Sequence, residues 1–120
     1  MSEDLKESQR AQTQLVKDVS VLMNECRQKI DQLDLKLVEL LNKRAEFALE
    51  LGRLKKTIGT KTYQPDREAA VLKNVCNVNR GPLGKEAITK LFEQIINENR
   101  RLECLVEEEN KKNISETKNF

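Results

Sequence analysis

The sequence contains no histidine and few aromatic, glycine or proline residues. Phe, Trp and Tyr together make up 3% of the 120 residues, beside four Gly and two Pro. This composition argues against a β-sandwich or barrel, which needs many turns and β-forming aromatic residues. Without histidine, the chain has no Ser-His or Cys-His catalytic pair and lacks the commonest zinc ligand. We therefore expect an all-helical domain whose chemistry uses Arg, Lys, Asp, Glu or amide side chains, and no metal.

The chain also lacks net charge, long apolar runs and a cysteine framework. Its 22 basic and 20 acidic residues leave a formal charge of +2, so it offers no net field for nucleic acid. Its apolar runs are far shorter than a membrane span, and the polar first 18 residues cannot form the apolar part of a signal peptide. Three scattered cysteines suit free thiols in a reducing compartment. We expect a cytoplasmic protein that binds neither nucleic acid nor membrane.

Polarity divides the chain into three parts. Residues 1–18 form a polar N-terminal arm, expected to be partly disordered or a helical extension, and residues 110–120 form a polar tail, expected to be disordered. Residues 19–109 carry the apolar periodicity and form the single domain.

Apolar residues recur every three or four positions from Val19 to Leu54, which predicts one long helix ending near Thr57. A helix of about 38 residues would be about 57 Å long at 1.5 Å per residue. No small globule contains such a rod comfortably, so it must pack against an equally long partner or protrude. Dimerisation is expected on this ground alone.

Two further helices are predicted after a loop at residues 59–61. The segment Gln64-Pro65-Asp66-Arg67-Glu68 has the Pro and the acidic residues typical of a helix start. This short helix should end at Gly81-Pro82, where the glycine can adopt a left-handed cap, and its apolar side should carry Val71, Leu72, Val75 and Val78. A helix of medium length should follow from about Lys85 to Glu109, with an apolar stripe through Ile88, Phe92, Ile95, Leu102 and Val106.

Two cations interrupt the apolar series of the long helix. Arg44 and Lys55 occupy positions in the series Leu37, Leu41, Arg44, Ala48, Leu51, Lys55. They lie about 20° apart around the helix axis and about 16 Å apart along it. Each side chain can reach the surface or pair with a carboxylate, but two cations on one buried face also suit a shared anion.

Polar groups recur on the predicted third helix, where Asn99 lies in the apolar seam and Glu103 one turn later. Asn99 suits either a core hydrogen bond or a ligand contact, and Glu103 suits neutralisation of Lys55. Arg67 and Glu68 are equally ambiguous, because an acid in a first helical turn ordinarily complements the dipole. These residues together predict a small polar pocket for a small anion inside a helical dimer.

The ordered motifs of residues 20 to 108 resemble those of the all-helical (AroQ-type) chorismate mutases. The matching runs are Arg27-Gln-Lys-Ile-Asp-Gln-Leu-Asp, Leu37-Val-Glu-Leu-Leu-Asn-Lys-Arg44, Leu51-Gly-Arg-Leu-Lys55, Pro65-Asp-Arg67-Glu68, Asn79-Arg-Gly-Pro-Leu83 and Leu91-Phe-Glu-Gln-Ile-Ile96. The resemblance implies an intertwined homodimer of three-helix subunits that converts chorismate to prephenate on the way to phenylalanine and tyrosine. The rearrangement is unimolecular and pericyclic, so no nucleophile, metal or organic cofactor is implied.

The resemblance also implies roles for the cations. Arg44 is similar to the family's arginine that holds a substrate carboxylate, and Lys55 to the lysine that reaches a carboxylate and the ether oxygen. Arg27 is similar to the arginine that the other subunit contributes. Helix geometry agrees, because 17 residues place Arg27 about 26 Å along the axis from Arg44 and about 100° around it. An antiparallel partner helix would bring its Arg27 to this Arg44 and create two equivalent shared sites.

The remaining site residues follow the family pattern with three departures. Arg67 and Glu68 match the family's Arg-Glu pair, whose Glu binds the substrate hydroxyl. Gln64 stands where an Asp is frequent, which leaves a backbone contact, and Asn99 replaces a frequent Ser. Glu103 stands where many bacterial members have Gln, and a carboxyl donates a hydrogen bond to the ether oxygen only when protonated. We therefore predict activity that rises towards acid pH.

Two alternatives remain at this point. An isochorismate-pyruvate lyase would share the fold, the dimer and much of the cationic pocket, although the segment Pro65-Asp66-Arg67-Glu68 is closer to the mutase pattern. A non-catalytic helical dimerisation module would use Glu68 and Glu103 merely to neutralise buried cations.

Overall fold

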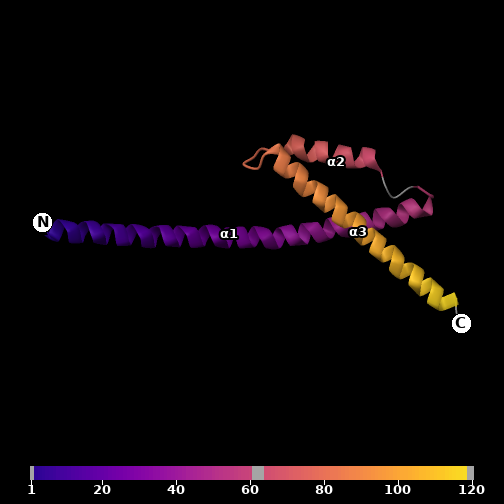
Figure 1. The fold of residues 1–120 in the computed structure, drawn as a ribbon, viewed down its shortest axis with the longest axis horizontal. Coiled ribbons are helices and arrows are strands. Elements are labelled where there is room, and N and C mark those ends of the chain that lie inside the picture. The colour runs from indigo at the N-terminus through magenta and orange to yellow at the C-terminus, as the bar shows by residue number, and fades with distance from the viewer. Residues whose placement is uncertain (1, 61–63, 119–120) are drawn as a thin grey trace. The chain divides into compact units, whose positions relative to one another are not determined.

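The computed structural model describes residues 2–60 and 64–118, and the exposure of side chains up to residue 113. These residues form three helices and no strand: α1 from Ser2 to Thr57, α2 from Pro65 to Val78, and α3 from Lys85 to Lys118 (Figure 1). The prediction of an all-helical chain with one long, one short and one medium helix is confirmed.

Both long helices extend beyond the region of apolar periodicity. The helix predicted from Val19 begins at Ser2, and the helix predicted to end at Glu109 continues to Lys118. The prediction of a disordered tail is therefore wrong for residues 110–118, while residues 119 and 120 lie outside the described part. Both extensions lack Gly and Pro; the N-terminal one is rich in Glu, Lys and Gln, and the C-terminal one carries three Lys and a Glu, all of which favour helix without an apolar stripe. Pairs one turn apart, such as Gln14 with Asp18 at 3.1 Å, add to this.

The chain divides into two units, residues 1–40 and residues 41–120. Within the first unit, every described residue, 2 to 40, belongs to α1 and is exposed. The second unit holds the C-terminal part of α1 together with α2 and α3, and it contains the packing between α2 and α3. The functional site is therefore to be sought among residues 41–120.

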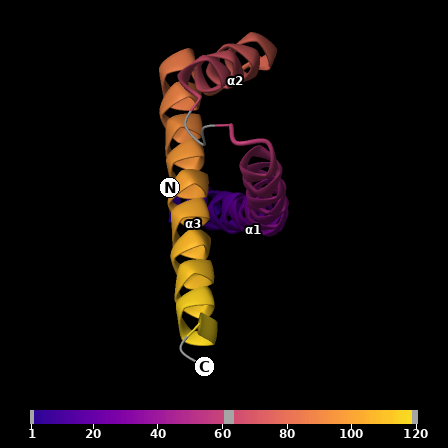
Figure 2. The same cartoon turned by 90° about the vertical axis from the view of Figure 1, so that its right-hand side faces the viewer.

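In the second unit, α2 lies beside the first turns of α3 (Figure 2). The predicted apolar side of α2 is half-buried at Val71, Leu72 and Val75, but Val78 is 73% exposed. Val78 is the last residue of α2, so the predicted apolar side is packed only as far as Val75. The predicted stripe of α3 packs as expected, with half-buried side chains at Ile88, Phe92, Ile95, Leu102 and Val106.

The turn between α2 and α3 differs in detail from the prediction. Helix α2 ends three residues before Gly81, and Asn79 occupies the C-cap in an extended conformation. The Asn79 side chain closes the turn, since its Nδ2 donates to the carbonyl of Leu83 at 2.7 Å and its Oδ1 accepts from the Gly81 amide at 3.1 Å. Gly81 does have the predicted positive φ, 78°, in the loop rather than at the helix cap. The asparagine therefore takes the capping position that was expected for the glycine.

No described residue of the chain is fully buried, and α1 carries many exposed large apolar side chains. The residues predicted to form its apolar face are among them: Leu33 is 58% exposed, Leu37 54% and Leu51 48%. Burial of apolar surface is the main favourable term in folding, at about 25 cal/mol per Å². Because these side chains are exposed, this face of α1 is uncovered within a single chain and contributes little of that burial energy.

Candidate active site

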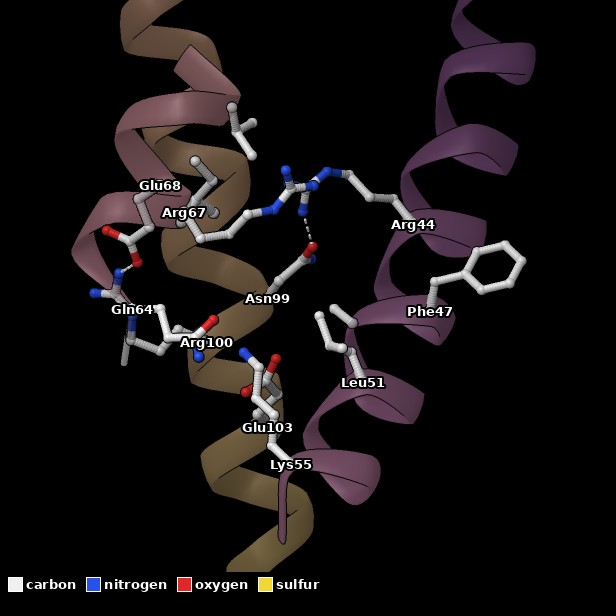
Figure 3. A pocket seen from close by; sticks show the side chains of 13 residues that line it. Arg44, Phe47, Leu51, Lys55, Gln64, Arg67, Glu68, Asn99, Arg100 and Glu103 are labelled. Carbon is white, nitrogen blue, oxygen red and sulfur yellow. Dashed lines mark hydrogen bonds and ion pairs between the residues drawn. The ribbon is translucent and has the colours of Figure 1, made fainter. Parts of the chain in front are cut away.

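Side chains from all three helices surround a cavity of about 260 Å³ within residues 41–120 (Figure 3). Four cations and two carboxylates lie in its wall beside amides and apolar groups. The lining residues are Arg44, Phe47, Ala48, Leu51, Lys55, Gln64, Arg67, Glu68, Val71, Ile96, Asn99, Arg100 and Glu103. Seven of the eight residues predicted from the sequence are in this set, and Arg27 is the exception.

Arg44 extends from α1 towards α3 and donates a hydrogen bond from Nη1 to Oδ1 of Asn99 (Figure 3). The predicted polar position in the seam of α3 is thus a partner for the predicted cation in the seam of α1. An amide oxygen orients the guanidinium but leaves its positive charge uncompensated, and the guanidinium has five N–H donors in all. Arg44 is therefore held in place and still able to bind an anion.

The start of α2 contributes Gln64, Arg67 and Glu68. Pro65 occupies the first turn, and the Gln64 carbonyl accepts the hydrogen bond of the Glu68 amide at 3.2 Å, which closes the first helical turn. The Gln64 side chain makes no capping hydrogen bond and lines the cavity instead. The Arg67 side chain extends from α2 towards Arg44 (Figure 3). Two guanidinium groups that converge in this way repel each other unless an anion lies between them.

Arg100 is the site residue that sequence reasoning missed. Its guanidinium forms a salt bridge with the Glu68 carboxylate, joining α3 to the start of α2 (Figure 3). Both side chains are partly buried, with 38% and 29% of their surfaces exposed. In the sequence, Arg100 belongs to a polar run between Glu98 and Arg101 that is typical of a solvated face. Its position in the sequence, one residue after Asn99 and three before Glu103, could have indicated that Arg100 lies near the same face of α3 as these two residues.

Lys55 and Glu103 lie together at the other end of the cavity (Figure 3). Burial raises the pKa of the Glu103 carboxyl above its ordinary value, and the charge of Glu107 acts in the same direction. The positive charges of Lys55 and Arg100 oppose this rise in pKa without cancelling it. Gly52 faces the same carboxyl, since a Cβ there would lie 3.6 Å from Cδ and Oε2 of Glu103. The raised pKa favours a protonated carboxyl that can donate a hydrogen bond.

Arg27 is predicted to act in the site of a second copy, which a single chain does not test, and Phe47 was not singled out from the sequence. Arg27 is exposed, does not line the cavity, and has Nη1 3.4 Å from Oδ1 of Asn24, one turn earlier on α1. Phe47 belongs to the lining, but its ring turns away from α3 and is 70% exposed (Figure 3).

The chemistry available in this cavity is binding and electrostatics. Among the described residues, no three Cys, Asp or Glu side chains are grouped so as to hold a metal ion. In the same part of the chain, no helix is long and apolar enough to cross a membrane. The four cations suit a ligand with more than one anionic group, and the two carboxyls and two amides can hydrogen-bond neutral oxygens. The fold and the site define an all-helical protein with a cationic pocket for a small anion.

Comparison with known proteins identifies the family. The family model for type II chorismate mutases matches residues 26–104, more than half of the chain and every residue found in the cavity wall. The chain belongs to the type II chorismate mutase family.

Individual relatives agree with this assignment. The bifunctional chorismate mutase/prephenate dehydratase of Neisseria gonorrhoeae is 40% identical over 72 residues, which cover 60% of this chain and 19% of that protein. The protein of the same description from Pseudomonas aeruginosa is 43% identical over 75 residues, 58% of this chain and 20% of that one. The match thus spans about a fifth of these relatives. A solved chorismate mutase (Form II) from Thermus thermophilus is 32% identical, with a TM-score of 0.66 over 68% of this chain and 92% of that chain.

Proposed function

We propose that the chain is a chorismate mutase, an intramolecular isomerase that converts chorismate to prephenate in phenylalanine and tyrosine biosynthesis. The observation that carries the proposal is the convergence of Arg44, Lys55 and Glu68 from two helices with Asn99 and Glu103 from a third around one cavity. In this reaction, the C–O bond of the substrate ether breaks and a C–C bond forms within the same molecule. No atom is gained or lost, so the protein needs no cofactor.

The cations would hold the substrate in a folded conformation. Chorismate carries two carboxylates, one on the ring and one on the flexible side chain. Arg44, oriented by Asn99, binds one of them as a bidentate donor, and Lys55 reaches both a carboxylate and the ether oxygen. Fixing the side chain over the ring removes the entropy cost of reaching the reactive geometry.

Lys55 and Glu103 would stabilise the transition state. Negative charge develops on the ether oxygen as the C–O bond breaks, and donors already aimed at that atom lower the barrier. Lys55 donates at any pH at which it is charged. Glu103 donates only in its protonated form, which its raised pKa favours towards acid pH.

The start of α2 would bind the rest of the substrate. Glu68, held by Arg100, accepts a hydrogen bond from the ring hydroxyl. Gln64 offers its backbone and its side-chain amide, and Arg67 adds positive charge beside Arg44. These contacts distinguish a hydroxylated dicarboxylate from a simple dianion.

We further propose an intertwined homodimer in which each site is completed by the second copy's equivalent of Arg27. Arg27 is exposed and lies 17 residues before Arg44 on the same helix, too far for both to bind one small ligand. The uncovered apolar face of α1 supports a second copy as its cover. Residues 19–109 then form the catalytic domain, with residues 1–18 as an N-terminal arm that is helical from Ser2. A cytoplasmic location stays a prediction from the cysteine content.

The test is a direct assay of the purified chain. Chorismate is followed by its loss of absorbance and prephenate by chromatography, and isochorismate is assayed separately for pyruvate and salicylate. We expect prephenate from chorismate and no pyruvate from isochorismate. Release of pyruvate and salicylate would instead identify a lyase, the second enzyme that this cationic pocket suits.

Matched variants separate catalysis from a structural role of the cations. Lys55→Met removes the donor to the ether oxygen and should lower kcat by about a hundredfold or more. Lys90→Met is the control, because Lys90 pairs with Glu86 at 3.0 Å on the exposed face of α3 and lies outside the cavity. Equal activity of the two variants would contradict the proposal and favour a non-catalytic dimerisation module.

A further inference from the structure

Glu103 lies in the wall of two cavities. One is the substrate cavity, and the other is a smaller space of about 70 Å³ between α1 and α3, lined by Gly52, Lys56, Glu103 and Glu107 among others. Charged and apolar side chains both line this smaller space. The Glu103 carboxyl therefore has a second environment that the substrate does not occupy. We call this smaller space the rear cavity.

Gly52 is what opens the rear cavity to the carboxyl. It is a glycine within α1 whose missing side chain would lie 3.6 Å from Cδ and Oε2 of Glu103. The carboxyl therefore rests against the glycine of α1 on one side and faces the substrate cavity on the other. A charge placed in the rear cavity acts on Glu103 without contacting the substrate.

The rear cavity contains such charges as an ion pair. Lys56 Nζ lies 3.3 Å from Oε1 of Glu107, which follows Glu103 by one turn of α3. Residues four apart on a helix are neighbours, and like charges at this spacing repel. The Glu107 charge raises the pKa of Glu103. The Lys56 ammonium lies beside the Glu107 carboxylate, and its opposite charge offsets the field of Glu107. Lys56 and Glu107 line the rear cavity and not the substrate cavity.

The other charged groups around Glu103 have different positions. Lys55 and Arg100 lower the pKa of Glu103 but line the substrate cavity, so changing them also changes substrate binding. The remaining charged residues that line either cavity are Arg44 and Arg53 of α1 and Arg67 and Glu68 of α2. Of these, Arg53 lines the rear cavity and the others line the substrate cavity.

We propose that Lys56 and Glu107 are positioning residues that set the pH range over which Glu103 keeps its proton. Glu107 extends that range upward and Lys56 limits the extension by pairing with Glu107. For catalysis, this rests on the proposed function, in which protonated Glu103 donates to the ether oxygen. The pair would then determine how much activity remains as the pH rises.

The test measures Glu103 directly and activity separately. The carboxyl of Glu103 is titrated by carbon-13 NMR, with Glu103→Gln used to assign its signal, and kcat is measured over the same pH range. Glu107→Gln should move the Glu103 midpoint down by about half a pH unit, and Lys56→Gln should move it up by a similar amount. On the falling limb of the profile, each shift is about a threefold change in kcat, in opposite directions. Glu108→Gln, an equal charge change at the next, exposed position of α3, is the control and should leave both profiles in place.

The double variant tests the route of the effect. If Lys56 acts through Glu107, Lys56→Gln adds no shift in the Glu107→Gln background. Glu103 titrations that superimpose for wild type, Glu107→Gln and Lys56→Gln would overturn the proposal. A shifted Glu103 titration with an unchanged kcat profile would support the pair's effect on the proton and overturn its link to catalysis.

Discussion

Replacing Glu103 by Gln should remove the pH dependence of the reaction. An amide donates a hydrogen bond at every pH, whereas the carboxyl donates only while protonated. Because burial raises the pKa of Glu103, the wild-type carboxyl keeps its proton to a higher pH than an exposed glutamate. The wild-type kcat should therefore be highest at acid pH and fall as the pH rises through that pKa.

The size of the effect follows from the loss of one donor at the ether oxygen. Above the pKa, the protonated fraction falls about tenfold for each pH unit. Loss of a single donor of this kind costs about a hundredfold to a thousandfold in kcat, and Lys55 remains as the second donor, so we expect a total fall of about a hundredfold. Glu103→Gln should match wild type within a few fold at the acid end and exceed it by up to about a hundredfold at the alkaline end.

The assay is the initial rate of chorismate loss at saturating substrate from about pH 4 to about pH 9, which spans the ordinary range of a buried carboxyl. Glu108→Gln controls for the loss of one negative charge on α3 and should keep the wild-type slope. A wild-type profile that is flat over this range refutes the reasoning. A Glu103→Gln profile that keeps the wild-type slope refutes it equally, because another group would then be titrating.

Three further outcomes follow from the structure. Gly52→Ala should raise the melting temperature in a thermal unfolding experiment, because the new Cβ meets its neighbours at 3.6 Å and alanine favours helix by about 1 kcal/mol; a lower melting temperature would contradict this. Arg100→Met should raise KM for chorismate by roughly fivefold with a smaller change in kcat, because Glu68 loses the partner that orients it, while Arg101→Met, on the exposed face, should change neither constant. Deletion of residues 1–18 should leave kcat/KM within about twofold of the full chain, because none of the described residues among them lines the cavity. A tenfold fall, about 1.4 kcal/mol, would assign the arm a role at the site.

The helices were predictable from the sequence where apolar periodicity or a breaker marks them. The spacing of Leu37, Leu41 and Leu51 predicts α1, and Pro65 marks the start of α2 correctly. The helix ends at Ser2 and Lys118 were not predictable in this way, because charged helical segments without an apolar face carry no periodic signal.

The site residues were predictable where a polar residue interrupts an apolar series. Arg44 and Asn99 interrupt the seams of two helices, and the structure joins them by a hydrogen bond. Arg100 lies at the edge of the seam among other charged residues, and only the position of α2 shows that it faces Glu68. The proposed contribution of Arg27 depends on a second copy of the chain, which the sequence indicates through the length of the first helix and through the family resemblance.

The charge of the wall around the substrate cavity has a consequence for how the substrate arrives. Its four cations and two carboxylates sum to +2, which equals the formal charge of the whole chain. With these six residues set aside, eighteen basic and eighteen acidic residues remain, so the rest of the molecule is neutral overall. A dianion approaching through solution is therefore drawn to one place on the molecule rather than to its surface at large. The rate of encounter, and with it kcat/KM, should decline as ionic strength rises, while the bound substrate rearranges at an unchanged rate.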